Sequence, residues 1–428
     1  MRAVTMKWLA NLTLGLTVLG LLAACGGGDD RTKAKLRMVN ASSGYSALSL
    51  VVDDETRLSS VAYGSSDGYI DVDPDKTDTE VRRAGSSTAL VSFTPALTKN
   101  RHYTVLAYGG EGALKTLLLD DNVDTPDSGK TLLRIINAAP DAGTVDVYIT
   151  GSDDSLADAV PLQLAAAAGT VNSYLTVNAG TRRLRVTATG SKTDLRLDLS
   201  TLALPSERAA TLVITPGSGG VLVNALLLTE QGGIARLDTT QARVRVAAAV
   251  ADSGAVVASA GGVSLAAGIG APAVGAYKLV TAGAVAPTVT VNGVAVATAS
   301  TTLTAGADYT LMVYGPASAA AAVWLDDDNR PATDSTKAKL RLVHGIGDLT
   351  AALALSVDFV PVADSVTRGT DSAYYADLAP SITADYLVTA PGLTSLSGVD
   401  KTFVAGGVYT LFVAGSTAVP TAMLIKDR

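Results

Sequence analysis

The chain has 428 residues, of which 48% are hydrophobic and 5% aromatic, and its 33 basic and 40 acidic residues give a formal net charge of −7. This negative balance argues against binding to nucleic acid or to an anionic membrane surface, because both need a basic face. The length exceeds what one hydrophobic core usually supports, so we expect several domains.

Residues 1–24 have the layout of an export signal. Arg2 and Lys7 precede an apolar run from Trp8 to Ala24. The run is slightly shorter than the roughly 20 residues that a membrane-spanning helix needs. A positively charged start followed by a short apolar run is typical of a signal peptide, and we predict one here.

The signal ends in Leu22-Ala23-Ala24-Cys25, which resembles the lipobox of bacterial lipoproteins, whose cysteine thiol receives a diacylglycerol. Cys25 is the only cysteine of the chain, whereas exported proteins normally use cysteines in pairs. The alternative is an ordinary signal peptide or anchor helix with an incidental cysteine. The lipobox resemblance implies lipid attachment at Cys25. Gly26 in the next position implies sorting to the outer membrane of a Gram-negative bacterium. It does not indicate whether the protein faces the periplasm or the cell surface.

Residues 25–34 are rich in glycine and then polar, so we predict a flexible tether between the lipid and the first folded element. Four similar segments follow, and each opens with an apolar run around an arginine, at intervals of roughly 100 residues, a usual domain size. The four arginines are Arg37, Arg134, Arg245 and Arg341. We therefore predict four domains, at residues 35–130, 131–236, 237–338 and 339–428. The interval from the first arginine to the third nearly equals that from the second to the fourth, which indicates that a pair of domains was duplicated as a unit.

The pattern inside the segments is that of β-strands. Residues 144–149 and 183–187 alternate polar and apolar side chains, which predicts strands whose polar side chains face solvent. Residues 288–291 and 294–296 flank Asn292-Gly293, a pair that favours a two-residue hairpin. Each segment closes with two apolar runs around a glycine, which predicts a final pair of strands.

Many short strands with frequent turn signals predict an all-β chain of tandem antiparallel β-sandwich domains of immunoglobulin-like kind. The cores must be aliphatic, because no cysteine follows Cys25 and Trp324 is the only tryptophan beyond the signal.

The second opening, residues 132–151, resembles the start of a bacterial family of domains of unknown function, numbered 4397. The family pattern is L-R-hydrophobic-hydrophobic-N/H, then P-D-A and V-D-V-Y, and the residues that match it are Arg134, Asn137, Pro140, Asp141, Val145, Asp146, Val147 and Tyr148. The other three copies match less well. The resemblance implies a β-sandwich in an exported, often lipid-anchored protein, and it implies no reaction.

No residue pattern points to catalysis. The two histidines, His102 and His344, occupy strand ends where the other copies carry different residues, and we interpret them as ordinary polar positions. Residues 64–68 match G-x-S-x-G, but that motif needs a strand that turns into a helix. The following residues, 69–74, do not begin a helix, so we predict a surface turn, no catalytic residue and no cofactor.

Carboxylates cluster three times along the chain, at positions that could suit calcium, a cation that prefers several oxygen ligands. The clusters are Asp71, Asp73, Asp75 and Asp78; Asp120, Asp121, Asn122, Asp124 and Asp127; and Asp326, Asp327, Asp328 and Asn329. None has the glycine and glutamate spacing of an EF-hand, and turn chemistry explains the same residue types. We predict no metal site, with calcium between neighbouring domains as the alternative.

These features favour a non-enzymatic, lipid-anchored cell-envelope protein that acts as an adhesion, spacer or binding module. Its expected partners are the membrane, through the N-terminal lipid, and an envelope protein or glycan, but no nucleic acid. One alternative is a glycan-binding or accessory module. Another is a hydrolase that uses two carboxylates, as glycosidases do.

Overall fold

The structure is a computed structural model that describes residues 32–428. The predicted signal peptide, Cys25 and most of the predicted tether therefore lie outside the described residues. The described chain is built from 36 β-strands and two single-turn 3-10 helices, Pro140–Ala142 and Ala317–Ala319. None of its helices is long and apolar enough to cross a membrane.

The strands form four consecutive domains, each with two packed sheets. In domain 1 the sheets are β4 (Ile70–Val72), β1 (Ala34–Asn40), β7 (His102–Tyr108), β8 (Lys115–Asp120), and β3 (Glu55–Ala62), β2 (Ala47–Val52), β5 (Thr79–Arg83), β6 (Ala89–Phe93). In domain 2 they are β12 (Leu175–Asn178), β9 (Lys130–Asn137), β15 (Arg208–Pro216), β16 (Val223–Thr229), β17 (Ile234–Leu237), and β11 (Gln163–Ala166), β10 (Val145–Thr150), β13 (Gly180–Ala188), β14 (Ser191–Leu204).

Domains 3 and 4 repeat this plan. Domain 3 has β21 (Ala273–Val274) and β22 (Lys278–Thr281) beside β18 (Gln241–Val250), then β27 (Asp308–Gly315), β28 (Ala321–Asp327); a second sheet of β20 (Val263–Gly270), β19 (Ala255–Ala260), β24 (Thr288–Val291), β25 (Val294–Val296); and the pair β23 (Gly283–Val285), β26 (Thr301–Leu303). Domain 4 has β32 (Tyr375–Leu378), β29 (Ala338–His344), β35 (Val408–Gly415), β36 (Pro420–Lys426), and β31 (Val360–Val366), β30 (Leu353–Val357), β33 (Ser381–Thr389), β34 (Leu396–Phe403). The predicted all-β fold of tandem sandwiches is confirmed.

The first strand of each domain pairs in parallel with the strand that begins its closing hairpin. The four parallel pairs are β1 with β7, β9 with β15, β18 with β27 and β29 with β35. The other strand pairs of the sandwiches are antiparallel, and the parallel pair was not predicted from the sequence. We call the sheet that contains it the interface sheet of the domain. Its two central strands are buried on both faces, which is typical of strands with nearly continuous apolar runs.

The core of each domain is mainly aliphatic, as predicted. In domain 2 the buried cluster consists only of Ala, Val, Leu and Ile side chains. Trp324 is only partly buried, and its ring lies edge-on to Tyr309 at 6.4 Å between centroids. The predicted hairpin at Asn292-Gly293 is also confirmed: β24 pairs with β25, and the two turn residues have φ values of 50° and 80°.

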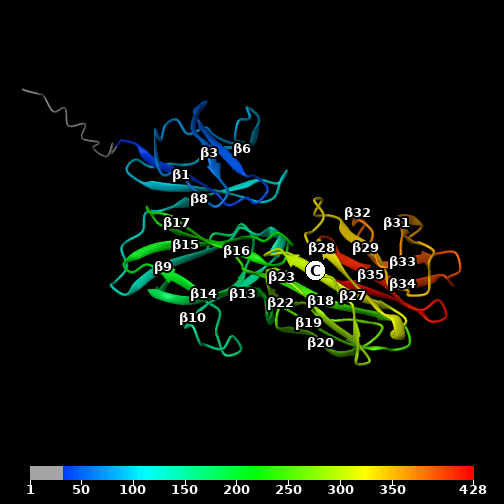
Figure 1. Cartoon of the computed structure of the whole chain (residues 1–428). Coiled ribbons are helices and arrows are strands. Elements are labelled where there is room, and N and C mark those ends of the chain that lie inside the picture. Colours follow the sequence, from blue (N-terminus) through cyan, green and yellow to red (C-terminus); the bar gives the residue numbers. More distant parts are fainter. Residues whose placement is uncertain (1–31) are drawn as a thin grey trace, which may run out of the picture.

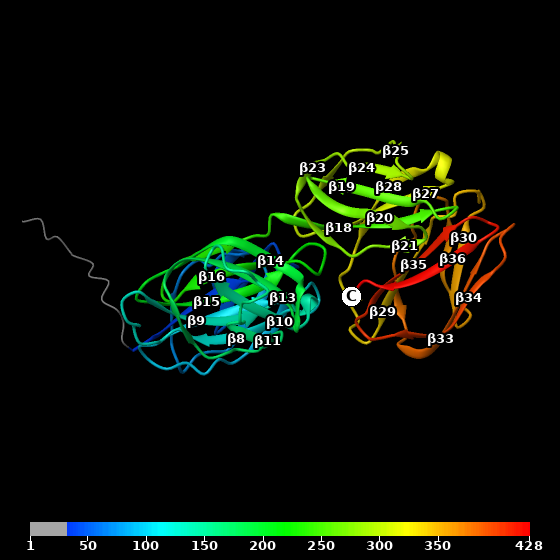
Figure 2. The same ribbon diagram turned by 90° about the horizontal axis from the view of Figure 1, so that it is seen from below.

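Domains pack in pairs through their interface sheets (Figures 1 and 2), so that the chain forms two lobes. Apolar side chains fill each contact. Between domains 1 and 2 the buried ones are Val39, Ala41, Leu106, Tyr108, Leu119, Ile136, Ala138, Val213, Leu226 and Leu228. Between domains 3 and 4 they are Ala247, Ala249, Met312, Leu325, Val343, Phe412 and Ala414. The first strand of each domain therefore contributes one face to its own core and the other face to its partner domain.

One prediction about side-chain exposure was wrong. Polar residues of β10 and β13 that were expected to face solvent are buried: Asp146 is 1% exposed, Arg185 3% and Thr187 0%. Asp146 is buried because its carboxylate accepts hydrogen bonds from two backbone N–H groups, those of Ala165 at 2.8 Å and Gly190 at 2.9 Å. The alternation of polar and apolar residues predicts the strand correctly, but it does not show that loops cover the polar face of the strand.

Candidate functional site

The arginine that opens each domain lies in a buried cluster that recurs in all four domains. The parallel register places it directly beside a threonine of the neighbouring strand. In every copy the arginine Nε donates a hydrogen bond to the threonine Oγ1, at 2.7 to 3.1 Å. The four pairs are Arg37–Thr104, Arg134–Thr211, Arg245–Thr310 and Arg341–Thr410.

The same threonine donates a hydrogen bond to a carboxylate at the end of the last strand of the hairpin. The distances lie between 2.5 and 2.7 Å, and the four carboxylates are Asp121, Glu230, Asp327 and Asp427. Each threonine thus joins a cation to an anion through one hydroxyl, with the arginine as donor and the carboxylate as acceptor. The short distances agree with hydrogen bonds to an ionised acceptor.

A tyrosine beside the edge strand covers the arginine. The ring centroids of Tyr69, Tyr174, Tyr277 and Tyr374 lie 4.6 to 4.9 Å from the guanidinium carbons. Such cation–π contacts are stronger when the cation is desolvated. We call each set of arginine, threonine, carboxylate and tyrosine a quartet. The tyrosine hydroxyl donates to the carboxylate in the first three, at 2.5 to 2.8 Å, whereas the Tyr374 hydroxyl is buried without a hydrogen-bond partner among residues 32–428.

Between domains 3 and 4 the two quartets exchange ion pairs. Arg245 of domain 3 pairs with Asp427 of domain 4, and Arg341 of domain 4 pairs with Asp327 of domain 3. Burial raises the pKa of Asp327, but the two arginines outweigh this effect and hold the pKa below its usual value. Because each buried charge faces an opposite one in the other domain, the ion pairs tie the two domains together in one arrangement.

Between domains 1 and 2 the quartets make weaker ion pairs. Arg134 of domain 2 lies 3.8 Å from Asp121 of domain 1, and Arg37 donates to the Gly232 carbonyl at 2.8 Å across the interface. Burial, with a further contribution from Glu230, raises the pKa of Asp121 to about 7. Within residues 32–428, Asp121 Oδ1 and Glu230 Oε2 are both buried without a hydrogen-bond partner. This contact is therefore the less electrostatically balanced of the two.

The asparagine or histidine that ends the first strand ties down the loop after it. Asn40 donates to the carbonyls of Tyr45 and Val61, at 3.1 and 3.2 Å. His344 takes the same place in domain 4: its Nδ1 accepts from the Ile346 N–H, and its Nε2 lies 3.2 Å from the Ala351 carbonyl. Burial lowers the pKa of His344. These contacts are those of a structural polar position, as the sequence indicated.

The other candidate residues lie apart from one another. His102 begins β7, and its ring lies edge-on to Tyr69 at 5.0 Å between centroids. Residues 64–68 form a turn between strands with no helix after it, so the predicted surface turn is confirmed. Cys25, the predicted lipid attachment site, lies outside the described residues.

The acidic clusters contact cations of the chain itself. Asp71 pairs with Lys35 at 2.9 Å, and Asp120 pairs with Arg101 at 2.6 Å. Arg330 and Lys339 contact Asp328 at 2.7 and 3.0 Å and lower its pKa to about 2, although burial raises it. Within residues 32–428, no group of three or more His, Cys, Asp or Glu side chains is placed to hold a metal ion.

Three open cavities lie where the lobes meet. One, about 430 Å³ in volume, lies between Ser218, Asp326 and Tyr374, and the other two are bigger. The larger, about 1010 Å³, has residues of all four domains in its walls, among them Lys115, Asp141, Asp328 and Lys339. The smaller, about 550 Å³, lies between β14, β18, the segment before β22 and the end of β36. Both volumes fall in the range of small-molecule sites.

The sequence carries signals for the quartets that were not recognised from the sequence alone. The arginines were noted as markers of the repeats, and two of the four carboxylates, Asp121 and Asp327, lie in acidic runs that close a domain. The tyrosines follow small or polar residues in all four copies: DGY, NSY, GAY and SAY. An alignment of the middle of the copies, in addition to their ends, identifies the complete quartet.

Comparisons with known proteins agree with the repeat structure. Residues 34–148 and 242–355 match the model of a domain of unknown function, DUF4397, and together they make up just over half of the chain. Each match covers one domain and the first strands of the next. Residues 132–148 therefore lie at the end of the matched region, and not at its start as the resemblance suggested. A comparison with curated proteins found no match.

Solved structures give only distant similarities. The Bacillus anthracis TIE protein is 10% identical, with 86% of this chain and 65% of that chain covered and a TM-score of 0.15. A candidate cell adhesion protein from Bacteroides fragilis is 9% identical, with 72% and 86% covered and a TM-score of 0.15. The chain thus spans slightly less than two thirds of the TIE protein. The repeated match to the family model, in contrast, covers the quartets of domains 1 and 3, and on this ground the chain belongs to the DUF4397 family.

Proposed function

We propose that this protein is a lipid-anchored, non-enzymatic module of the bacterial cell envelope, which holds a binding or adhesion surface away from the membrane. The observation that carries the proposal is Leu22-Ala23-Ala24-Cys25 at the end of an export signal, with no second cysteine in the chain. Two or more acyl chains are needed for stable anchoring, because a single chain binds only marginally.

The arrangement of the domains supports a mechanical role. Buried quartets and apolar contacts join domains 1 and 2 and domains 3 and 4, so that each lobe consists of two sandwiches packed on each other. The charged groups of the quartets are used within these contacts and hold the domains in place. A chain of such lobes on a lipid anchor would act as a spacer with a fixed shape.

The experiment is a comparison of three forms in the native bacterium: the natural chain, Cys25→Ser, and Gly27→Ser as a control that keeps the thiol. We expect the natural and Gly27→Ser proteins in the membrane fraction, with an acylated N-terminal Cys25 in mass spectra. We expect Cys25→Ser to leave the membrane fraction. An unmodified product that retains residues 1–24 would overturn the proposal. Protease treatment of intact cells then shows which face of the membrane carries the domains.

A further inference from the structure

The cavity of about 550 Å³ between the lobes has an unusual excess of cations for a protein of net negative charge. Five basic side chains lie in its walls, together with two acidic ones, Asp194 and Asp427. The basic ones are Lys192 of β14, Arg243 and Arg245 of β18, Lys278 of β22 and Lys426 of β36. Because these residues come from domains 2, 3 and 4, the folded chain is needed to bring them together. We call this space the lysine cavity.

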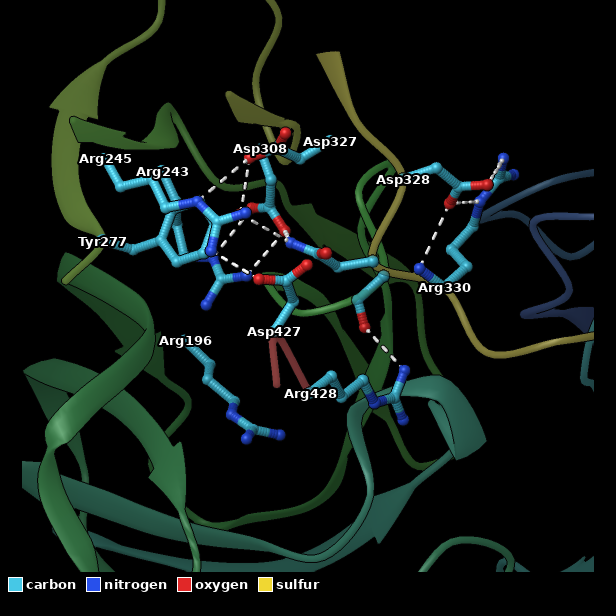
Figure 3. Close-up of polar contacts among 12 residues, drawn as sticks. Arg196, Arg243, Arg245, Tyr277, Asp308, Asp327, Asp328, Arg330, Asp427 and Arg428 are labelled. Atoms are coloured by element: carbon cyan, nitrogen blue, oxygen red, sulfur yellow. Dashed lines mark hydrogen bonds and ion pairs between the residues drawn. The ribbon is translucent and has the colours of Figure 1, made fainter. Parts of the chain in front are cut away.

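The acidic groups of the lysine cavity are already paired with arginines. Asp427 pairs with Arg245, and Asp194 pairs with Arg196 at 3.0 Å. Arg243 has its own carboxylate, Asp308, on which it makes two hydrogen bonds of 2.8 and 2.6 Å. Figure 3 shows Arg243 and Arg245 beside Tyr277, with Asp308 and Asp427 next to them.

The charges of the three lysines are therefore left unbalanced. Within residues 32–428 no carboxylate forms an ion pair with Lys192, Lys278 or Lys426. Lys192 does donate two hydrogen bonds, to the carbonyls of Ala157 and Ala159, at 2.6 and 2.8 Å. These neutral acceptors hold the ammonium group in place without cancelling its charge.

A buried donor in the wall of the same cavity also lacks an acceptor. The Arg245 side chain is 2% exposed, and its Nη2 is buried without a hydrogen-bond partner in the described part of the chain. A buried donor that stays unsatisfied costs about 1 to 3 kcal/mol. Because this atom has almost no accessible surface, a ligand in the cavity does not reach it, and the three lysines carry the charge that such a ligand meets.

A neighbouring arginine reports the positive potential of this region. Arg428 follows β36, and its Nη1 lies 3.4 Å from the Gly220 carbonyl. Burial, together with the cations Arg196 and Arg243, lowers the pKa of Arg428 to about 10, although Asp141 and Asp308 raise it. The three arginines are labelled in Figure 3, which places Arg196 and Arg428 on the opposite side of Asp427 from Tyr277.

We propose that the lysine cavity is a binding site for a phosphoryl group, carried by a soluble phosphorylated ligand or by a lipid headgroup. Three unbalanced lysines suit a dianion better than the single charge of a carboxylate. Lysine binds phosphate as a point charge. A volume of about 550 Å³ leaves room for a sugar-sized group beside the phosphate.

The test uses the full-length Cys25→Ser chain, so that its result does not depend on lipid attachment. The variant is Lys278→Ala/Lys426→Ala, because both side chains are exposed and make no ion pair within the described residues. The control is Lys76→Ala/Lys99→Ala in domain 1, which removes the same charge from exposed positions far from the cavity in the sequence. Calorimetric titration with inorganic phosphate, at constant ionic strength, measures the affinity of each form.

We expect phosphate to bind the natural cavity and the control alike, and the cavity variant at least about tenfold more weakly, since hydrogen bonds to charged groups are the strong ones. Equal weakening in both double variants, no binding of phosphate, or acetate bound as tightly as phosphate would overturn the proposal. A parallel sedimentation assay with phosphatidylglycerol vesicles separates the two sources. Vesicle binding that the cavity variant loses identifies a lipid headgroup, and binding of phosphate alone identifies a soluble ligand.

Discussion

The quartet arginines show how a charged side chain can be kept in the interior of a β-sandwich pair. Arg341 is fully buried, and four side chains contact its guanidinium group, among them Asp371 at 2.8 Å. Thr410 accepts a hydrogen bond from its Nε, Asp327 balances its charge and Tyr374 covers its face. A buried ion pair adds little net stability compared with an apolar pair of the same size, but removal of one partner is costly. The quartet therefore selects one arrangement of two domains more than it strengthens the fold.

Replacement of a quartet arginine should destabilise its lobe strongly. In Arg341→Gln the buried Asp327 loses one of its two arginines, and we expect the free energy of unfolding to fall by about 3 to 5 kcal/mol. The matched control is Arg236→Gln, whose ion pair with Asp238 is about half exposed and should contribute less than about 1 kcal/mol. Urea unfolding followed by circular dichroism measures both, because the strands of both lobes contribute to that signal. Similar midpoints for the two variants would contradict the role assigned to Arg341.

The two interfaces should differ in their response to pH. The pKa of Asp121 is about 7 in the folded chain and near 3.9 in an unfolded one. Between these pH values the folded state holds a proton on Asp121 that the unfolded state has released. The contribution of Asp121 to the free energy of unfolding is therefore fully present below about pH 4 and is lost as the pH rises to 7. We expect Asp121→Asn to gain stability relative to the natural chain over this interval. The measurement is the difference in melting temperature at pH 5 and pH 8.

Asp67→Asn is the control for this pH series, because Asp67 is exposed and should not change the difference with pH. If the melting temperatures of Asp121→Asn and the natural chain stay equally far apart at both values, then Asp121 is not the titrating group at the contact between domains 1 and 2.

At the scale of the elements, local patterns predicted local structure. Asn292-Gly293 gave a hairpin because few other residue pairs tolerate positive φ at both turn positions. The closing hairpins were also predictable, because two apolar runs joined by a glycine turn favour two adjacent antiparallel strands. The parallel pair was not predictable by this means, because its partners are separated by about 65 residues or more and no short-range signal links them.

Burial was the weakest part of the sequence prediction, for a related reason. A strand with both faces covered resembles a half-exposed one when the second face carries polar residues with partners, as Asp146 and the quartet arginines do. Likewise, the acidic runs looked like solvated turns or calcium ligands, whereas Asp121 and Asp327 bind a threonine and a tyrosine of their own domain. These partners are brought together only by the sheet register, and the sequence alone does not give that register.

At the scale of the molecule, the folding unit is the lobe of two domains. We expect residues 237–428 to form a soluble monomer with one cooperative unfolding transition. Residues 237–338 alone should associate, because Ala247, Met312 and their neighbours would lose the cover of Phe412, and Asp327 would lose Arg341. Size-exclusion chromatography with light scattering tests this, with residues 32–236 as the corresponding two-domain fragment of the other lobe. A monodisperse single domain as stable as the lobe would contradict it.

The parallel strand pair carries a consequence for how chains of this kind can grow. The outward face of this sheet is apolar and carries a charged arginine. A newly duplicated domain without a partner domain would therefore expose that face to solvent. We therefore expect such chains to gain domains in pairs. Chains with an odd number of domains should be rare, unless another protein covers the exposed face of the unpaired domain. The two regions that match the family model are separated by nearly the same number of residues at their starts, 34 and 242, and at their ends, 148 and 355, as expected if one pair of domains was duplicated.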